Sequence, residues 1–216
     1  MSHSLNEIAA HAKRAARGAG LSWGMAEEAA RAIRWLASHD LVGPVLLADV
    51  LAQNDGRPYA QVAPVSLEGE WHAPKGDLCP LAVGTTLNDC ADQLAEGPSI
   101  KAVNVSCPLL VLPFAAWAAV HLKEPVRLSY DTVQIETDGN GIWINDPHRE
   151  INTHTAKSLT CQRTSKRTDA AQLPSLRGAV TPEVWARLDV FAQRTFAPAT
   201  EASRQLGAGA GASDND

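Results

Sequence analysis

The chain has 216 residues, of which 45% are hydrophobic and 20% are charged, so it can bury a globular core without disulfide or metal staples. Its 19 basic and 24 acidic side chains give a net charge of −5, which disfavours binding to nucleic acid. Residues 1–20 lack the apolar segment of an export signal, and no stretch approaches the roughly 18 apolar residues of a membrane span. We therefore expect a cytoplasmic protein with reduced cysteines and no membrane partner.

Two alanine-rich helices are predicted at the start of the chain, over residues 4–17 and roughly 25–38. The first begins with a capping box, in which the Ser4 hydroxyl accepts from a free amide and the Glu7 carboxylate reaches back. Ser22 is placed to cap the second helix. Because small side chains let helix axes approach closely, we expect these helices to pair as an antiparallel hairpin.

Two Cys-Pro-Leu tripeptides follow, beginning at Cys79 and Cys107. Each is predicted to belong to a short strand that is followed by a helix. The two copies are a weak indication of an internal repeat. The predicted elements are strands at 79–84 and 106–111, and helices from Thr85 or Thr86 to about 94 and at 114–121.

A third helix and a strand-rich region complete the expected fold. The helix begins near Gly43-Pro44, because proline is favoured at the first helical position. Alternating apolar residues over 125–160 predict strands, and Asp138-Gly139-Asn140-Gly141 predicts a hairpin turn. A capped amphipathic segment predicts a last helix over residues 182–196.

We therefore expect an α+β fold: an N-terminal helical hairpin plus a third helix packed on a mixed or antiparallel sheet, closed by the C-terminal helix. The helical part covers residues 4–54 and the sheet-rich part residues 60–160. Both belong to a single predicted domain at residues 1–206. Residues 207–216 form a Gly-rich acidic tail that should be flexible by composition.

Four segments carry a resemblance to a known family: Ser4–Ile8, Ala15–Gly24 with Glu27–Ala29, Cys79–Leu81 and the terminal Gly-Ala-Gly-Ala-Gly-Ala-Ser-Asp-Asn-Asp. In these segments the sequence resembles a bacterial family, common in proteobacteria, that is known only as a domain of unknown function. Its genes often lie near genes for the catabolism of small organic compounds. The resemblance therefore implies a bacterial protein of small-molecule metabolism, without an assigned activity.

The start of the second helix carries the first candidate site. One interpretation of Ser22-Trp23-Gly24 is a capped helix start with a packed tryptophan. The other assigns Ser22, Trp23 and Glu28 to ligand binding and Glu27 to catalysis. An acid/base role would require a buried or paired carboxylate with a shifted pKa.

Cys79 and Cys107 are the second set of catalytic candidates. Free cysteines are most often small buried hydrophobic residues, and a catalytic thiolate needs a basic partner. The matched Cys-Pro pairs would also fit an enzyme with two thiols that face each other across a cleft. The histidines considered as partners are His72, His121, His148 and His154.

The chain ends with Asp214, Asn215 and Asp216, which we assign to ligand binding. Their carboxylates could bind a hard cation, or the glycine run could let the terminus complete a neighbouring site. A flexible tail is the alternative interpretation. The metal requirement and any cofactor stay unknown at this point.

Two functions remain open. The first is an enzyme that acts on a small organic metabolite in a catabolic pathway, as a lyase, hydrolase or isomerase. Its partner would be a small-molecule ligand, and whether it forms a homodimer is left open. Such an enzyme should have a deep pocket with Trp23, Glu27 and a cysteine facing inward. The second is a non-catalytic binding or accessory subunit of a catabolic enzyme, which should present a broad exposed apolar patch.

Overall fold

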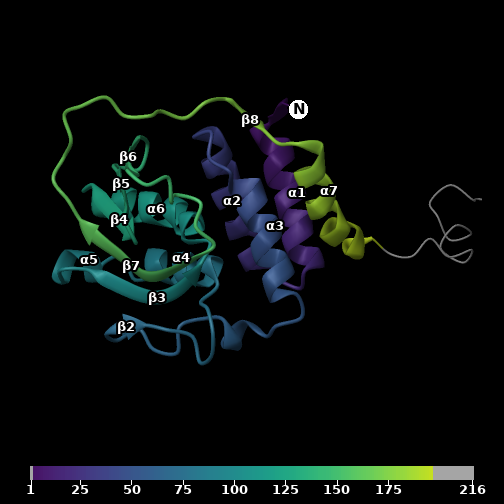
Figure 1. Cartoon of the computed structure of the whole chain (residues 1–216), viewed down its shortest axis with the longest axis horizontal. Helices are drawn as coiled ribbons and strands as arrows, with labels where there is room; N and C mark the ends of the chain where they lie inside the picture. Colours follow the sequence, from purple (N-terminus) through teal and green to yellow (C-terminus); the bar gives the residue numbers. More distant parts are fainter. Residues whose placement is uncertain (1, 197–216) are drawn as a thin grey trace, which may run out of the picture.

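The computed structural model describes residues 2–196 and confirms the α+β fold (Figure 1). The helices are α1 (Leu5–Gly18), α2 (Trp23–Ser38), α3 (Gly43–Asn54), α4 (Pro80–Asp89), α5 (Gln93–Glu96), α6 (Leu112–Leu122) and α7 (Pro182–Ala192), with 3-10 turns η1 (Tyr59–Gln61), η2 (Pro108–Val111) and η3 (Gln193–Thr195). The strands are β1 (Ser2–Ser4), β2 (Glu70–Trp71), β3 (Ile100–Ser106), β4 (Val126–Tyr130), β5 (Val133–Thr137), β6 (Ile142–Asn145), β7 (Thr155–Arg163) and β8 (Arg177–Ala179).

The helices α1 and α2 pack side by side and form the predicted hairpin. The capping box at the start of α1 is present: the backbone N–H of Glu7 donates to Ser4 Oγ over 3.2 Å, and the Ser4 N–H donates to Glu7 Oε2 over 2.8 Å. The alanines Ala12, Ala15 and Ala29 are fully buried. Small side chains therefore let the two helix backbones approach closely.

The main sheet has the strand order β2-β3-β7-β4-β5-β6. Only the β2–β3 pair is parallel among the described strands, so the sheet is mixed. The predicted hairpin joins β5 to β6, and Asp138 Oδ1 accepts the backbone N–H groups of Asn140 and Gly141 in its turn. A second sheet pairs β1 with β8, which lies just before α7.

Helices α4 and α6 lie between the N-terminal helices and the sheet. Helix α6 packs on β4 and β5, α4 packs on β3, and α2 contacts both of these helices. The residues Leu112 to Ala116 are all buried, as expected for a helix that is apolar all round and enclosed by protein. The N-terminal helices thus meet the sheet through α4 and α6.

Helix α7 packs on α1 and α3, at the side of the bundle away from the main sheet (Figure 1). The predicted C-terminal helix therefore closes the fold on the N-terminal bundle and not on the main sheet. Its predicted start, with Thr181 as the N-cap, is confirmed because Thr181 Oγ1 accepts the N–H of Val184. The α-helix ends at Ala192, and η3 extends it to Thr195.

The two short strands predicted around the Cys-Pro-Leu units are wrong. Residues 80–84 are the first turns of α4, and residues 108–111 form η2, which leads into α6. In both cases proline takes the first helical position, where its missing N–H costs nothing. A short apolar run has the same pattern in a buried strand and in a buried helix.

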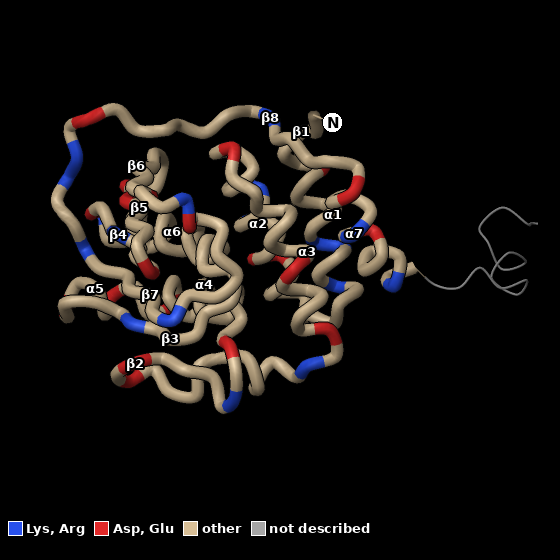
Figure 2. Tube along the Cα trace, viewed as in Figure 1, with Lys and Arg blue, Asp and Glu red and all other residues tan. Residues whose placement is uncertain are grey.

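Within residues 2–196, no helix is both long and apolar enough to cross a membrane. Figure 2 shows acidic and basic residues interspersed over all parts of the described chain. Charges of both signs are therefore present in the helical bundle and in the region of the sheet.

Candidate functional site

A cavity of about 720 Å³ lies where the α1–α2 turn, the end of α3 and the start of α4 meet. We call it the interhelical cavity. Its walls are mostly apolar, with a few polar groups among them, as in many small-molecule sites. The lining residues are Ala19, Gly20, Leu21, Ser22, Met25, Asn54, Gly56, Arg57, Pro58, Tyr59, Val62 and Cys79.

Cys79 lies in the wall of this cavity, at the N-cap of α4. Its backbone N–H donates to the carbonyl oxygen of Val62 over 2.8 Å, which fixes the residue in place. Burial raises the pKa of the Cys79 thiol, while hydrogen bonds from the Ala82 and Leu81 amides and the charge of Arg57 lower it. The thiol is protonated at neutral pH, but groups that stabilise a thiolate surround it.

Arg57 and Asn54 supply the polar side of the same cavity. The Arg57 guanidinium donates to Asn54 Oδ1 over 3.2 Å, and in the part of the chain that the structure describes it forms no ion pair. The Asn54 Nδ2 group is buried and has no hydrogen-bond partner among these residues. Arg57 thus brings a positive charge without an ionic partner to the cavity, which is the arrangement that a bound anion would complete.

Ser22 lies between the interhelical cavity and a neighbouring cavity of about 370 Å³. Its hydroxyl accepts the backbone N–H of Met25 over 3.2 Å, so the predicted cap is confirmed. Glu28 lines the second cavity and forms an ion pair with Arg31 over 2.9 Å. Two of the predicted ligand-binding residues therefore reach cavities.

Trp23 and Glu27 lie on the outer surface of the α1–α2 hairpin instead. Trp23 is 65% exposed, and the Arg17 guanidinium lies 4.5 Å from its ring centre. Glu27 accepts a hydrogen bond from Lys13 over 2.7 Å, and this bond lowers the pKa of the Glu27 carboxyl. Neither residue lines the interhelical cavity, so the structure does not bring them to Cys79.

Cys107 belongs to a second group of side chains, with Asp49 and His154. The Sγ atom of Cys107, a carboxylate oxygen of Asp49 and an imidazole nitrogen of His154 all lie within 4.8 Å of one another. Burial, followed by the nearby Asp49 and Cys79, raises the pKa of the Cys107 thiol to about 11. His154, one of the four histidines considered from the sequence, therefore lies beside a predicted catalytic cysteine.

The remaining predicted ligand residues, Asp214, Asn215 and Asp216, lie outside the described residues. Arg57, Asn54 and Asp49 are not among the site residues predicted from the sequence. Arg57 lies in a Gly-Arg-Pro loop, where a cation is ordinary. Asn54 and Asp49 lie on a helix without a distinctive motif, so local sequence gave no signal for them.

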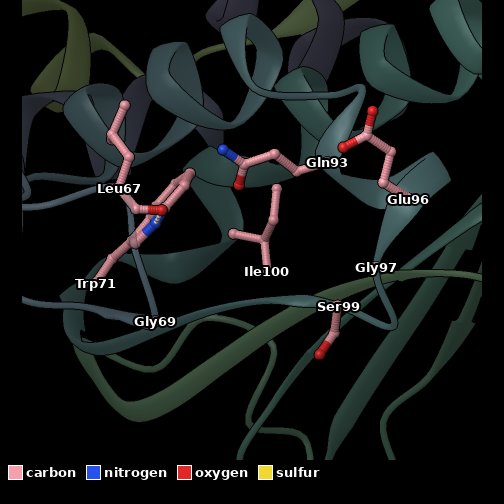
Figure 3. Close-up of a pocket in the computed structure, with 8 residues that line it drawn as sticks. All are labelled: Leu67, Gly69, Trp71, Gln93, Glu96, Gly97, Ser99 and Ile100. Carbon is pink, nitrogen blue, oxygen red and sulfur yellow. Dashed lines mark hydrogen bonds between the residues drawn. The ribbon is translucent and has the colours of Figure 1, made fainter.

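A smaller pocket of about 340 Å³ lies beside β2, α5 and the start of β3. Figure 3 shows the side chains of Gln93 and Ile100 between those of Trp71 and Glu96. The Trp71 Nε1–H group donates to the carbonyl oxygen of Leu67. None of the residues that line this pocket has a thiol or an imidazole, so it offers fewer reactive groups than the interhelical cavity.

Residues 3–79 match the model of a family described as "Protein of unknown function (DUF3726)". No curated protein and no solved structure matched the chain. The matched segment includes all residues that line the interhelical cavity, from Ala19 to Cys79. The segment that is similar to this family therefore builds the whole cavity.

Proposed function

We propose that the protein is an enzyme that binds a small organic acid in the interhelical cavity and acts on it through the Cys79 thiol. One observation carries the proposal: Arg57, whose guanidinium has no ion pair among the described residues, and Cys79 line the same cavity. The family match supports it, because the matched residues 3–79 include every residue that lines this cavity.

The polar groups favour a carboxylate as the recognised group. A guanidinium presents parallel N–H donors that fit the two oxygens of a carboxylate. Asn54 Oδ1 accepts a hydrogen bond from this guanidinium and helps to hold it at the cavity. The apolar walls would hold the organic part, and a cavity of about 720 Å³ is of the size that small-molecule sites have.

Cys79 is the candidate for the reacting group. The first-turn amides of α4 donate to its sulfur, and such donors stabilise a thiolate at a helix N-terminus. The reaction would belong to the lyase, hydrolase or isomerase class, in the catabolism of a small organic compound. The cytoplasm suits this chemistry, because the four cysteines are free thiols.

A non-catalytic binding subunit is the second candidate, and one observation favours it. No histidine and no carboxylate line the interhelical cavity, so Cys79 lacks a general base among the described lining residues. Both candidates require the same bound organic acid. They differ in whether that acid is converted.

Paired alkylating reagents test the anion site directly. Iodoacetate is a small organic acid and iodoacetamide is its neutral analogue, and mass spectrometry measures the alkylation rate at each cysteine of the full chain. We expect the iodoacetate-to-iodoacetamide rate ratio at Cys79 to exceed that at Cys90 by about tenfold or more, the effect of one charged hydrogen bond. Arg57→Gln should reduce the ratio at Cys79, whereas Arg34→Gln, a change of an exposed arginine on α2, should leave it unchanged.

Equal ratios at Cys79 and Cys90, or an unchanged ratio in Arg57→Gln, would contradict the anion site. Conversion is then tested with a panel of small organic acids and their thioesters, with products followed by NMR. An enzyme should form product in wild type and lose it in Cys79→Ser, which keeps the shape of the cavity. Ligand-induced stabilisation without product in wild type would favour the binding subunit.

A further inference from the structure

We propose that Asp49, Cys107 and His154 form a binding site for a divalent transition-metal ion, and that Zn²⁺ is the ion that suits them best. The three candidate ligand atoms lie within 4.8 Å of one another. None of these residues lines the interhelical cavity, so this site can exist whether or not the proposed function is correct.

Three separate parts of the fold bring the ligands together. Asp49 lies on α3, Cys107 follows the last residue of β3, and His154 precedes the first residue of β7. The pairing of β3 with β7 places Ser106 opposite Thr155, so Cys107 and His154 come next in the same register. Helix α3 packs on η2, which begins directly after Cys107. The backbone therefore holds the three residues together without any bound ion.

The arrangement fits metal binding better than a Cys-His-Asp catalytic relay. In such a relay the nucleophile and the carboxylate contact opposite nitrogens of the imidazole ring, and so lie on opposite sides of it. Here the cysteine sulfur and the carboxylate oxygen lie within 4.8 Å of each other and of the same imidazole nitrogen. Three atoms in a triangle leave a position between them, where an ion about 2.0–2.3 Å from each ligand fits after small side-chain rotations.

The donor atoms select the class of ion. A thiolate sulfur, an imidazole nitrogen and a carboxylate oxygen are the ligands that Zn²⁺ uses in proteins. Ca²⁺ and Mg²⁺ prefer sites built from oxygen ligands alone. Three protein ligands would leave a fourth tetrahedral position open, as in zinc sites that bind water or a substrate.

Arg187 is the charged group on α7 that contacts this cluster. Its guanidinium donates to Asp49 Oδ1 over 2.5 Å. The carboxylate keeps its second oxygen for an ion, and ligating carboxylates in metal sites are commonly held by such outer hydrogen bonds. A divalent ion would also be balanced by the two negative charges of the thiolate and the carboxylate.

The backbone of Cys107 gives a second, independent observation. Its φ angle is +41°, in the left-handed region. This conformation is costly for a residue with a side chain, and residues that adopt it are concentrated at functional sites. In Cys107 it turns the chain sharply between β3 and η2, where the thiol meets Asp49 and His154.

Cobalt titration of the full chain, first stripped with a chelator, tests the site. We expect one Co²⁺ per chain, with a thiolate-to-cobalt charge-transfer band in the near ultraviolet and the visible bands of a tetrahedral ion. Added Zn²⁺ should remove both sets of bands by displacing the cobalt. A chain that gives no charge-transfer band would overturn the proposal.

Matched variants identify the ligands. His154 is exposed, so His154→Ala should fold normally. It should bind cobalt at least about tenfold more weakly, because mutations at metal sites commonly reduce metal affinity by about 10–100-fold. His148→Ala, a change of another exposed histidine, should bind as wild type does. Cys107→Ser should lose the charge-transfer band and Cys90→Ser should keep it. Unchanged affinity in His154→Ala would overturn the site, and none of these results depends on Cys79 or Arg57.

Discussion

The backbone N–H of Cys107 donates a hydrogen bond to the carbonyl oxygen of His154 over 2.8 Å. This bond continues the antiparallel ladder of β3 and β7 by one residue beyond the Ser106–Thr155 pair. The thiol and the imidazole are therefore positioned by the sheet, whereas Asp49 is positioned by a helix of the N-terminal bundle. An ion that bound all three would connect the bundle to the sheet.

Zinc should therefore stabilise the folded protein, because the three ligands come together only in the folded chain. A ligand at a hundred times its Kd contributes about 2.7 kcal/mol, and each kcal/mol raises the Tm of a chain of this size by about 2–4 °C. Scanning calorimetry with and without Zn²⁺ measures the shift. His148→Ala should keep the shift and His154→Ala should lose it, so an equal shift in both variants would speak against the site.

The four cysteines should differ strongly in their reactivity with iodoacetamide. Cys90 is half-buried, whereas Cys161 lies in β7 with no exposed surface, and burial raises its pKa to about 12. Since the thiolate is the reactive form, we expect Cys161 to react at least about a hundredfold more slowly than Cys90. Site-resolved mass spectrometry checks the order, with urea-unfolded protein as the control in which the difference should disappear. Similar native rates would mean that β7 is not a central strand.

Gly18 is required by the close contact between α1 and α7. A Cβ atom at this position would lie 1.7 Å from the carbonyl oxygen of Phe191, so α7 would have to move. Gly18→Ala should lower the free energy of unfolding by about 1–3 kcal/mol, as overpacking usually does. Gly24→Ala is the matched control, because nothing lies within 4 Å of its added methyl group, and it should be neutral or slightly stabilising. Urea unfolding measures both, and equal effects would contradict the docking of α7.

The start of each capped helix could be predicted because capping is a local interaction. Ser4, Ser22 and Thr181 each accept a backbone N–H three residues ahead, which a short sequence pattern identifies. The elements after Cys79 and Cys107 could not be assigned in this way. Their apolar runs fit a strand or a helix, and the choice depends on the helical layer that forms between the bundle and the sheet.

The candidate site was predictable only in part for a related reason. Cys79 and Ser22 carry recognisable local patterns, and both line the interhelical cavity. Their companion Arg57 reaches the cavity because the loop after α3 folds back toward α4, which depends on tertiary structure. The pairing of Cys107 with His154 depends on the register of β3 and β7, which residue spacing along the chain does not encode.

His11 should make the stability of the fold depend on pH. Its imidazole is buried and stacks on the Trp185 ring, with 4.1 Å between the ring centres, while Nε2 lies 3.2 Å from the Trp185 carbonyl oxygen. Burial lowers the pKa of His11 below its ordinary value of 6.5, although the hydrogen bond to Trp185 acts in the opposite direction.

In the unfolded chain His11 regains its ordinary pKa, so below about pH 6.5 the unfolded state binds more protons than the folded state. The free energy of unfolding is therefore fully retained above that pH and falls as the pH drops toward the lower pKa of the folded state. Urea unfolding between about pH 5 and 8 measures this slope. His11→Leu should flatten the curve, because leucine fills the space but does not titrate, and His148→Ala should keep the slope of wild type. A His11→Leu curve as steep as that of wild type would show that other groups cause the dependence.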